Sequence, residues 1–205
     1  MITIIDYQTG NLGSLLNMIK KIGFSASVSS SPDEIIKAKA LILPGVGAFD
    51  TGMENLEKSR VLPVLHRKVI EEKTPILGIC LGMQLLGDSS EEGELPGLGW
   101  IHGKSVRFKP DTCQNLKVPH MGWNSVIPLQ KDILFSDMAP RAMFYFVHSF
   151  YFQCDNNGHA LALSEYGHPF TCALKKDNIR GVQFHPEKSL TYGMTLLRNF
   201  LREVA

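Results

Sequence analysis

The chain has 205 residues, of which 44% are hydrophobic and 20% charged, and its formal net charge is +1. These values are typical of one globular domain, residues 1–205, with a substantial core. The near-neutral charge gives no support to binding of nucleic acid or of an acidic membrane surface. No apolar segment is long enough to span a bilayer.

The four cysteines, at positions 80, 113, 154 and 172, form neither a CxxC pair nor a regular framework. They are expected to be reduced thiols in a cytoplasmic protein. None of the seven histidines lies at ligand spacing from another histidine or a cysteine, so no metal and no cofactor are predicted. Residues 1–5 lack a basic lead-in and a cleavage site, and are expected to form a first strand.

The first half of the chain alternates strand and helix patterns. Strands are expected over residues 2–6, 24–28 and 40–43, and over the run that ends at Cys80. Helices are expected over residues 12–22, from Ser31 onward, and after Phe49 to about residue 73 with an interruption near Pro63. Ser31, Pro32 and Glu34 have the spacing of a helix N-cap, N1 and N3. The pattern predicts an α/β fold, a mostly parallel sheet with helices on both faces and sites at the carboxyl ends of the strands.

The sequence pattern of the second half predicts shorter strands, which Gly, Pro and Asn residues separate. They are expected over residues 105–108, 125–127, 143–147, 160–165, 170–174 and 179–183. No linker precedes them, so they are interpreted as an antiparallel extension of the same sheet. A final helix over 190–204 should bury Met194, Leu197 and Leu201, a stripe at helical spacing.

The run from Thr74 to Gln84 predicts a buried strand that turns sharply into a helix at Cys80. Gly78 and Gly82 flank the bend, where side chains would collide with the turn. A cysteine at a helix N-terminus is favoured as the nucleophilic thiolate. The backbone N–H of Leu81 would then form half of an oxyanion hole. The alternative is a buried cysteine that closes a core strand.

A second glycine loop, Gly45 to Gly47, follows the strand over 40–43. Its backbone can approach a ligand closely, and we interpret Val46 and Gly47 as the second oxyanion donor. An ordinary strand-to-helix turn is an equally good interpretation of this loop alone. No Gly-Lys-Ser/Thr follows it, so a phosphate-binding loop is poorly supported.

The sequence His185-Pro186-Glu187 follows the last predicted strand and supplies a base with its orienting group. His185 can accept the Cys80 proton, and Glu187 can hold the imidazole tautomer. The proline restricts the backbone between them. In isolation this tripeptide is also typical of an exposed turn.

These motifs together resemble the class I (triad) glutamine amidotransferases, over essentially the whole chain. The resemblance narrows to the glutaminase subunits of imidazole glycerol phosphate synthase. The segments that carry it are Gly78-Ile-Cys-Leu-Gly-Met-Gln84, Gln183-Phe-His-Pro-Glu187, Pro44-Gly-Val-Gly-Ala-Phe49, Val118-Pro-His-Met-Gly-Trp-Asn124, Tyr145-Phe-Val-His-Ser149 and His185-Pro-Glu-Lys-Ser189. The chain departs from the family pattern at Gln8, where glycine is expected, and at Phe150, where tyrosine is common.

The resemblance implies hydrolysis of L-glutamine to glutamate and ammonia through a glutamyl thioester on Cys80, with His185 and Glu187 completing the triad. It also implies a glutamine pocket lined by Gly47, Gln84, Glu92, Ser149 and Phe150. Gln84 and Glu92 would meet the α-amino end of glutamine, and the backbone at Ser149 and Phe150 its carboxylate. Without the resemblance, Gln84 is interpreted as a solvated helix residue and Glu92 as an exposed loop acid.

The resemblance further implies a partner in trans, a (β/α)8-barrel cyclase subunit that forms a heterodimer with this chain. The cyclase would use the ammonia to make imidazole glycerol phosphate and the aminoimidazole carboxamide ribotide (AICAR) in histidine biosynthesis. The candidate docking residues are Asn11, Trp123, Asn124 and Lys188. By composition alone, Trp123 is as well explained by core packing. We interpret His120 and His148 as structural.

Three other functions are considered. An amidotransferase that serves another synthase, such as one of surface-sugar biosynthesis, would carry the same glutamine-hydrolysing motifs. A cysteine peptidase or a thiol-based deglycase shares the bend, but Gln84 and the complete His185 to Glu187 motif speak against both. A non-catalytic binding subunit is disfavoured by the intact triad.

Overall fold

The structure is a computed structural model that describes residues 1–109 and 116–203. Cys113 lies outside the described residues, and the other three cysteines, Cys80, Cys154 and Cys172, are free thiols. Within the two described ranges, no helix combines the length and the apolar character needed to cross a membrane.

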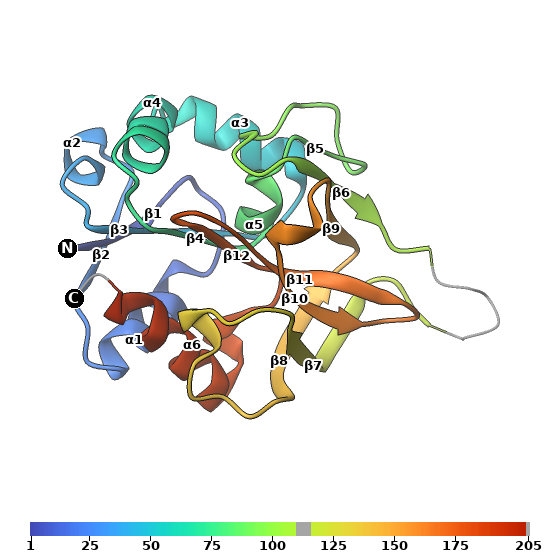
Figure 1. Cartoon of the computed structure of the whole chain (residues 1–205). Helices are drawn as coiled ribbons and strands as arrows, with labels where there is room; N and C mark the ends of the chain where they lie inside the picture. The colour runs from blue at the N-terminus through green and yellow to red at the C-terminus, as the bar shows by residue number, and fades with distance from the viewer. Residues whose placement is uncertain (110–115, 204–205) are drawn as a thin grey trace.

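The described residues form twelve strands in one mixed sheet, flanked by helices (Figure 1). The strands are β1 Ile2–Ile5, β2 Ala26–Ser29, β3 Ala40–Gly45, β4 Ile76–Cys80, β5 Ser89–Ser90, β6 Gly103–Arg107, β7 His120–Pro128, β8 Ala142–His148, β9 Phe150–Cys154, β10 Ala160–Glu165, β11 Pro169–Lys176 and β12 Ile179–Val182. The α-helices are α1 Leu12–Lys21, α2 Pro32–Ile35, α3 Phe49–Lys58, α4 Leu62–His66, α5 Leu81–Leu85 and α6 Leu190–Arg202. Shorter helical turns are the π-helix η1 Arg67–Glu71 and the 3-10 helices η3 Ile133–Phe135, η4 Asn157–His159 and η5 Pro186–Lys188.

The sheet has a parallel half and an antiparallel half, which confirms the predicted fold class. Strands β2, β1, β3, β4 and β12 are neighbours in that order and all run parallel. From β12 the sheet continues through β11, β10, β7 and β8 with antiparallel pairing. Strands β9, β6 and β5 branch from β11.

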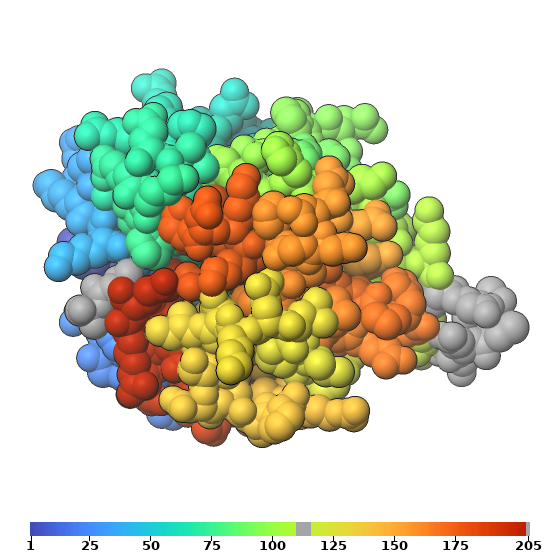
Figure 2. All heavy atoms as spheres, viewed as in Figure 1, coloured from blue at the N-terminus to red at the C-terminus, as the bar shows by residue number. Residues whose placement is uncertain are grey.

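Helices cover both faces of the parallel half, and each face has its own apolar cluster. Leu15 of α1 and Leu197 of α6 pack on one face, and Leu56 of α3 and Leu65 of α4 pack on the other. Figure 1 shows α1 and α6 below the sheet and α2 to α5 above it. In the space-filling view the N-terminal and C-terminal halves of the chain form one continuous surface (Figure 2). Strands buried on both faces explain the continuous apolar runs in the sequence.

Three carboxyl ends of parallel strands meet at one edge of the sheet. Gly45, the last residue of β3, is the register partner of Cys80, the last residue of β4. On the other side of β4, Val182 at the end of β12 pairs with Ile79. The loops after β3, β4 and β12 therefore lie together, as the α/β pattern predicts.

Two predictions about strands were incomplete. Strand β9 was not predicted, because Ser149 alone separates it from β8 and no Gly or Pro marks a turn there. Strand β7 is much longer than the predicted 125–127 and reaches back to His120. Its pairing with β8 supplies the stability that local residue preferences do not indicate.

Two predictions about helices are confirmed in part. Ser31 is the N-cap of α2 and Pro32 begins it, as predicted, but the Ser31 side chain makes no capping hydrogen bond. Its backbone N–H instead donates to Ser29 Oγ at 3.0 Å. In α6, Leu197 and Leu201 are buried, whereas Met194 is only half-buried.

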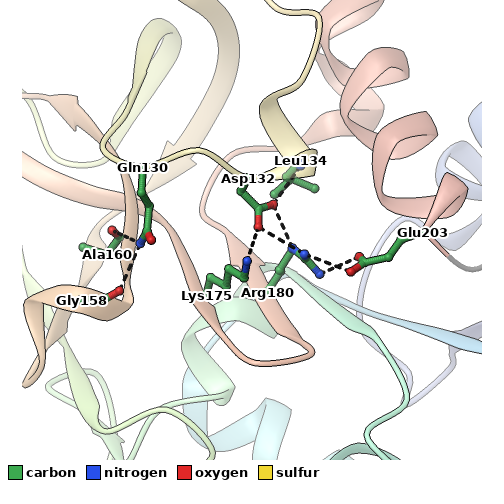
Figure 3. A network of polar contacts seen from close by, with 8 residues as sticks. All are labelled: Gln130, Asp132, Leu134, Gly158, Ala160, Lys175, Arg180 and Glu203. Carbon is green, nitrogen blue, oxygen red and sulfur yellow. Dashed lines mark hydrogen bonds and ion pairs between the residues drawn. The ribbon is translucent and has the colours of Figure 1, made fainter.

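A buried ion network holds the end of α6 to the sheet (Figure 3). The Asp132 side chain is completely buried before η3, and Arg180 of β12 donates to both of its oxygens at 3.0 and 3.2 Å. Lys175 of β11 lies 2.7 Å from the same carboxylate. Arg180 also donates to Glu203 at 2.8 Å. Burial raises the pKa of Asp132, but the hydrogen bonds from Arg180 and Lys175 outweigh it and lower that pKa.

Replacing Arg180 with alanine is expected to reduce the free energy of unfolding by about 3 kcal/mol, because Asp132 would stay buried without its main partner. The matched control is Lys58→Ala, which removes the exposed Lys58–Glu54 pair and should cost less than about 0.5 kcal/mol. Urea unfolding at neutral pH measures the free energy of unfolding of both variants.

The lowered pKa of Asp132 gives this prediction a pH dependence. The stabilisation is present above the usual aspartate pKa and is lost as the pH falls through the lowered value. The difference between wild type and Arg180→Ala should therefore shrink in acid. Equal stability of the two proteins at neutral pH would contradict the role given to the network.

Candidate active site

Cys80 lies at a strained bend between β4 and α5. Its φ angle is 53°, in the left-handed region, and its side chain is 8% exposed. A Cβ at Gly78 would lie 2.7 Å from the Gly82 carbonyl oxygen, and one at Gly82 would collide with the Leu43 carbonyl oxygen of β3. The structure therefore confirms the predicted bend and the reason for Gly78, whereas Gly82 is required by the close approach of β3 and not by the turn itself.

His185 and Glu187 are held together just beyond the end of β12. His185 Nδ1 and Glu187 Oε1 are 2.7 Å apart, which orients the ring. The His185 backbone N–H donates to the Tyr145 carbonyl at 2.9 Å, and Ser189 Oγ donates to the His185 carbonyl. Within the described residues, His185 Nε2 is buried and has no partner in hydrogen-bond geometry. This nitrogen remains free to exchange a proton with a group in the site.

The electrostatics of the site favour a charged His185. Burial lowers the pKa of His185, but interactions with the Cys80 thiolate and the Glu187 carboxylate outweigh it and raise the pKa to about 10. The imidazolium is therefore the stable form at neutral pH when the thiolate is present. An imidazolium beside the sulfur stabilises a thiolate, which is the nucleophilic form of cysteine.

A cavity of about 380 Å³ opens above Cys80. Its volume suits a ligand of amino-acid size. The residues predicted for the triad, the oxyanion hole and the glutamine pocket that line it are Cys80, His185, Val46, Gly47, Leu81, Gln84, Glu92, Ser149 and Phe150. Glu187 is not among its lining residues and lies behind His185.

Gln84 is buried, in contrast to its interpretation as a solvated helix residue. Its Nε2 donates to the Phe150 carbonyl at 3.2 Å and to Gln183 Oε1 at 3.0 Å. Gln183 was given no role from the sequence, yet its Nε2 lies 3.6 Å from Cys80 Sγ. The only sign of such a role in the sequence is that Gln183 is a polar residue at the end of an apolar strand. Its partners Gln84 and Cys80 are 99 and 103 positions away in the chain.

Glu92 is exposed, and it also has a structural contact. Its Oε2 accepts a 2.9 Å hydrogen bond from the Phe49 N–H at the beginning of α3. One carboxylate oxygen is thereby fixed at the rim of the cavity, and the helix N-terminus stabilises its negative charge.

The two predicted oxyanion segments face the same cavity. Leu81 is the first residue of α5, so its N–H has no partner within that helix. Gly47 has a φ of 103°, a conformation that L side chains rarely adopt, and open space lies where its Cβ would be. Val46 beside it is 46% exposed. The β3 loop thus presents backbone to the cavity with no side chain at Gly47 in the way.

The four predicted docking residues have different environments. Trp123 is 45% exposed on β7, and Lys188 is exposed with its ammonium over the Tyr145 ring. Asn11 caps α1 by accepting from the Ser14 N–H. Asn124 is half-buried, and its side chain bonds within the chain.

The structure shows the environments of the two residues that depart from the family pattern. Gln8 has a φ of 66°, the left-handed conformation in which glycine costs least, and its N–H donates to Asp6 Oδ1 at 3.0 Å. Phe150 is buried, and the Arg107 guanidinium lies over its ring.

In the part of the chain that the structure describes, no group of three or more His, Cys, Asp or Glu could hold a metal ion.

The comparisons with known proteins identify the class of this fold and site. The family described as Glutamine amidotransferase class-I matches residues 3–204. The chain therefore belongs to the class I glutamine amidotransferase family, and it is a glutamine amidotransferase.

Three similar relatives carry the name of one synthase subunit. Imidazole glycerol phosphate synthase subunit HisH 2 of Methanococcus maripaludis is 53% identical, over 99% of this chain and 100% of the relative. The protein of the same name from Pseudomonas aeruginosa is 48% identical over 100% of both chains. The subunit HisH of Bdellovibrio bacteriovorus is 46% identical over 98% of both.

Solved structures share the fold at low sequence identity. A crystal structure described as a glutamine amidotransferase has a TM-score of 0.75 and 20% identity, covering 98% of both chains. The structure of PurLQS from Thermotoga maritima has a TM-score of 0.74 and 16% identity, covering 100% of this chain and 98% of the other.

Replacing Gly82 with alanine should lower stability by about 2 kcal/mol and remove glutaminase activity, because β4 and α5 would have to move away from β3. The matched control is Gly13→Ala in α1, where a Cβ meets no atom within 4 Å. Thermal unfolding and a glutaminase assay measure both variants. A stable, active Gly82→Ala protein would show that the close approach to Leu43 does not constrain the bend.

Proposed function

We propose that this chain is the glutaminase subunit of an imidazole glycerol phosphate synthase, and that Cys80, His185 and Glu187 are its catalytic triad. The observation that carries the proposal is the strained Cys80 backbone at a cavity that His185 also lines. The identity to HisH subunits over nearly the whole chain supports the choice of synthase.

In the first chemical step, the Cys80 thiolate attacks the side-chain amide carbon of glutamine. The carbonyl oxygen becomes an oxyanion, which the N–H groups of Leu81 and of the Val46 to Gly47 segment stabilise. The C–N bond then breaks, and His185 Nε2 gives its proton to the leaving nitrogen. The products of this step are ammonia and a glutamyl thioester.

In the second step, water attacks the thioester with His185 as base. The thiolate charge is one cause of the high pKa of His185, and this charge is absent while Cys80 is acylated. The pKa of His185 should therefore fall after the first step, which lets the neutral ring take a proton from water. Collapse of the second oxyanion releases glutamate and restores the thiolate.

Glutamine is held between the two walls of the cavity. Gln84 Oε1 and the Glu92 carboxylate meet the α-ammonium group, and backbone at Ser149 and Phe150 meets the α-carboxylate. The Gly47 segment closes over the amide end. We place the enzyme in the cytoplasm, where the thiolate on which the reaction depends stays reduced.

The ammonia passes to a HisF-type (β/α)8-barrel cyclase in a heterodimer, through a surface that includes Asn11, Trp123, Asn124 and Lys188. Met121 at 62% exposure and Trp123 at 45% support a protein contact at β7, because large exposed apolar side chains in one strand are typical of an interface. The cyclase turns the ammonia and its ribulosyl phosphate substrate into imidazole glycerol phosphate and AICAR.

The Cys80→Ala variant should lose glutamine hydrolysis while the complex still uses added ammonium, because the nucleophile is absent and the docking surface is unchanged. Glutamate release and cyclase product formation measure the two activities. The same variant should have a lower His185 pKa by imidazole NMR, since the thiolate that raises it is gone. Loss of both activities together with the fold would make Cys80 a packing residue.

Glutaminase activity should be low for the chain alone and rise strongly with a HisF-type cyclase and its ribulosyl phosphate ligand. Trp123→Ala should raise the cyclase concentration needed for half-maximal activation by about tenfold or more, because the variant loses an interface anchor. The control is Leu129→Ala, an exposed apolar residue beyond the other end of β7. Full activity alone, indifferent to the cyclase, would leave the triad chemistry standing and assign the chain to another synthase.

A further inference from the structure

Two buried histidines that the proposed chemistry does not use face each other across β7 and β8. His120 and His148 are register partners, and they are 3% and 6% exposed. His120 Nδ1 and His148 Nε2 are 2.9 Å apart. Each ring therefore limits the orientation of the other, and no water is needed between them.

The direction of each hydrogen bond follows from the Phe150 carbonyl, which can only accept. His148 Nδ1 lies 2.8 Å from this oxygen and must carry a hydrogen. In a neutral imidazole the other nitrogen accepts, so His120 Nδ1 donates to His148 Nε2. His120 Nε2 then accepts from Asn124 Nδ2 at 3.2 Å. Three bonds thus run in one direction, from Asn124 to Phe150.

The outer end of this series has a fixed orientation. Asn124 Nδ2 also donates to the Glu165 carbonyl at 2.7 Å, and Asn124 Oδ1 accepts from the Ser125 N–H at 2.8 Å. A carbonyl acceptor on one side and an N–H donor on the other distinguish the two ends of the amide. The amide group of Asn124 therefore faces His120 with its nitrogen.

Both rings are confined and neutral. His120 is stacked between Tyr166 and Phe146, with ring centroids 4.1 and 4.9 Å away. Burial lowers the pKa of His120 to about 4 and that of His148 to about 3. The neutral forms that the bonding pattern requires are therefore the stable forms at neutral pH.

The inner end of the series reaches the candidate active site. The Phe150 carbonyl that accepts from His148 also accepts from Gln84 Nε2 at 3.2 Å. The second hydrogen of Gln84 Nε2 goes to Gln183 Oε1, and Gln183 Nε2 lies 3.6 Å from Cys80 Sγ. Both hydrogens of the Gln84 amide are thus held by protein acceptors. Its Oε1 remains for a ligand, which suits a cationic ammonium group.

We infer that His120 and His148 are positioning residues for glutamine: they fix the Phe150 carbonyl, and through it the orientation of the Gln84 amide. This inference rests on the proposed glutaminase function. Neither histidine lines the cavity, so each acts through another residue. Loss of the series should weaken glutamine binding and leave the chemical step nearly unchanged, because among the described residues neither ring is hydrogen-bonded to Cys80, His185 or Glu187.

The test compares glutamine KM and kcat of the full chain, with its cyclase partner present, in matched variants. His148→Leu removes the donor to Phe150 and should raise KM about tenfold, the effect of one buried hydrogen bond. His148→Asn keeps an N–H near the position of Nδ1 and should bring KM back within about threefold of wild type. In both variants kcat should stay near the wild-type value.

His168→Phe is the control, because His168 contacts Phe108 in the same aromatic cluster and its buried Nε2 has no partner among the described residues. It should leave KM and kcat unchanged. If His148→Leu does not fold, His120→Phe, which spares the bond between His148 and Phe150, should raise KM about threefold.

The outcomes separate the inference from the function on which it rests. Wild-type protein that hydrolyses no glutamine, with or without the cyclase, overturns both. Wild-type hydrolysis with an unchanged KM in folded His148→Leu protein, or in folded His120→Phe protein where His148→Leu does not fold, overturns the inference alone. Equal KM values for His148→Leu and His148→Asn also overturn it, because the donor to Phe150 would then have no effect.

Discussion

The left-handed backbone of Cys80 is the constraint on which the rest of the site depends. It lets the chain leave β4 and enter α5 within one residue, with the sulfur facing the cavity. At this bend the chain packs very closely against the two neighbouring strands, and glycines make the close approach possible. Gly82 lies against the Leu43 carbonyl of β3, and Gly181 of β12 lies against Met83 of α5. The helix α5 therefore sits over both strands next to β4, and the loops of all three strands are brought to the sulfur.

This constraint is also the reason why the nucleophile could be predicted from the sequence. The steric requirement at Gly78 is local in the chain, because a side chain there would meet Gly82 within the same turn. The requirement at Gly82 comes from Leu43 of β3, but the glycine itself is visible in the same short motif. The parallel half of the fold was predictable for a similar reason, since buried strands and amphipathic helices alternate along the sequence with short connections.

The parts that were not predicted depend on contacts between distant segments. Gln183 gains its place from partners about a hundred positions away. Gln84 is buried because Phe150 of β9 and Gln183, which follows β12, supply acceptors for both of its hydrogens. Strand β9 itself begins two residues after β8 ends and exists through its pairing with β6 and β11. Residue spacing carries no sign of such partners. The pair of His120 and His148, 28 positions apart, is invisible for the same reason.

Strand β7 carries both residues of the buried hydrogen-bond series and residues of the molecular surface, because successive side chains of a strand alternate between its two faces. His120 and Asn124 belong to the hydrogen-bond series, whereas Met121 and Trp123 are exposed. A shift of one residue in the pairing with β8 would exchange the two sets. The register that buries the histidines is thus the same register that exposes the tryptophan. A protein bound to the outer face would therefore contact the same strand whose other face carries His120, which is linked through His148 to the Phe150 carbonyl.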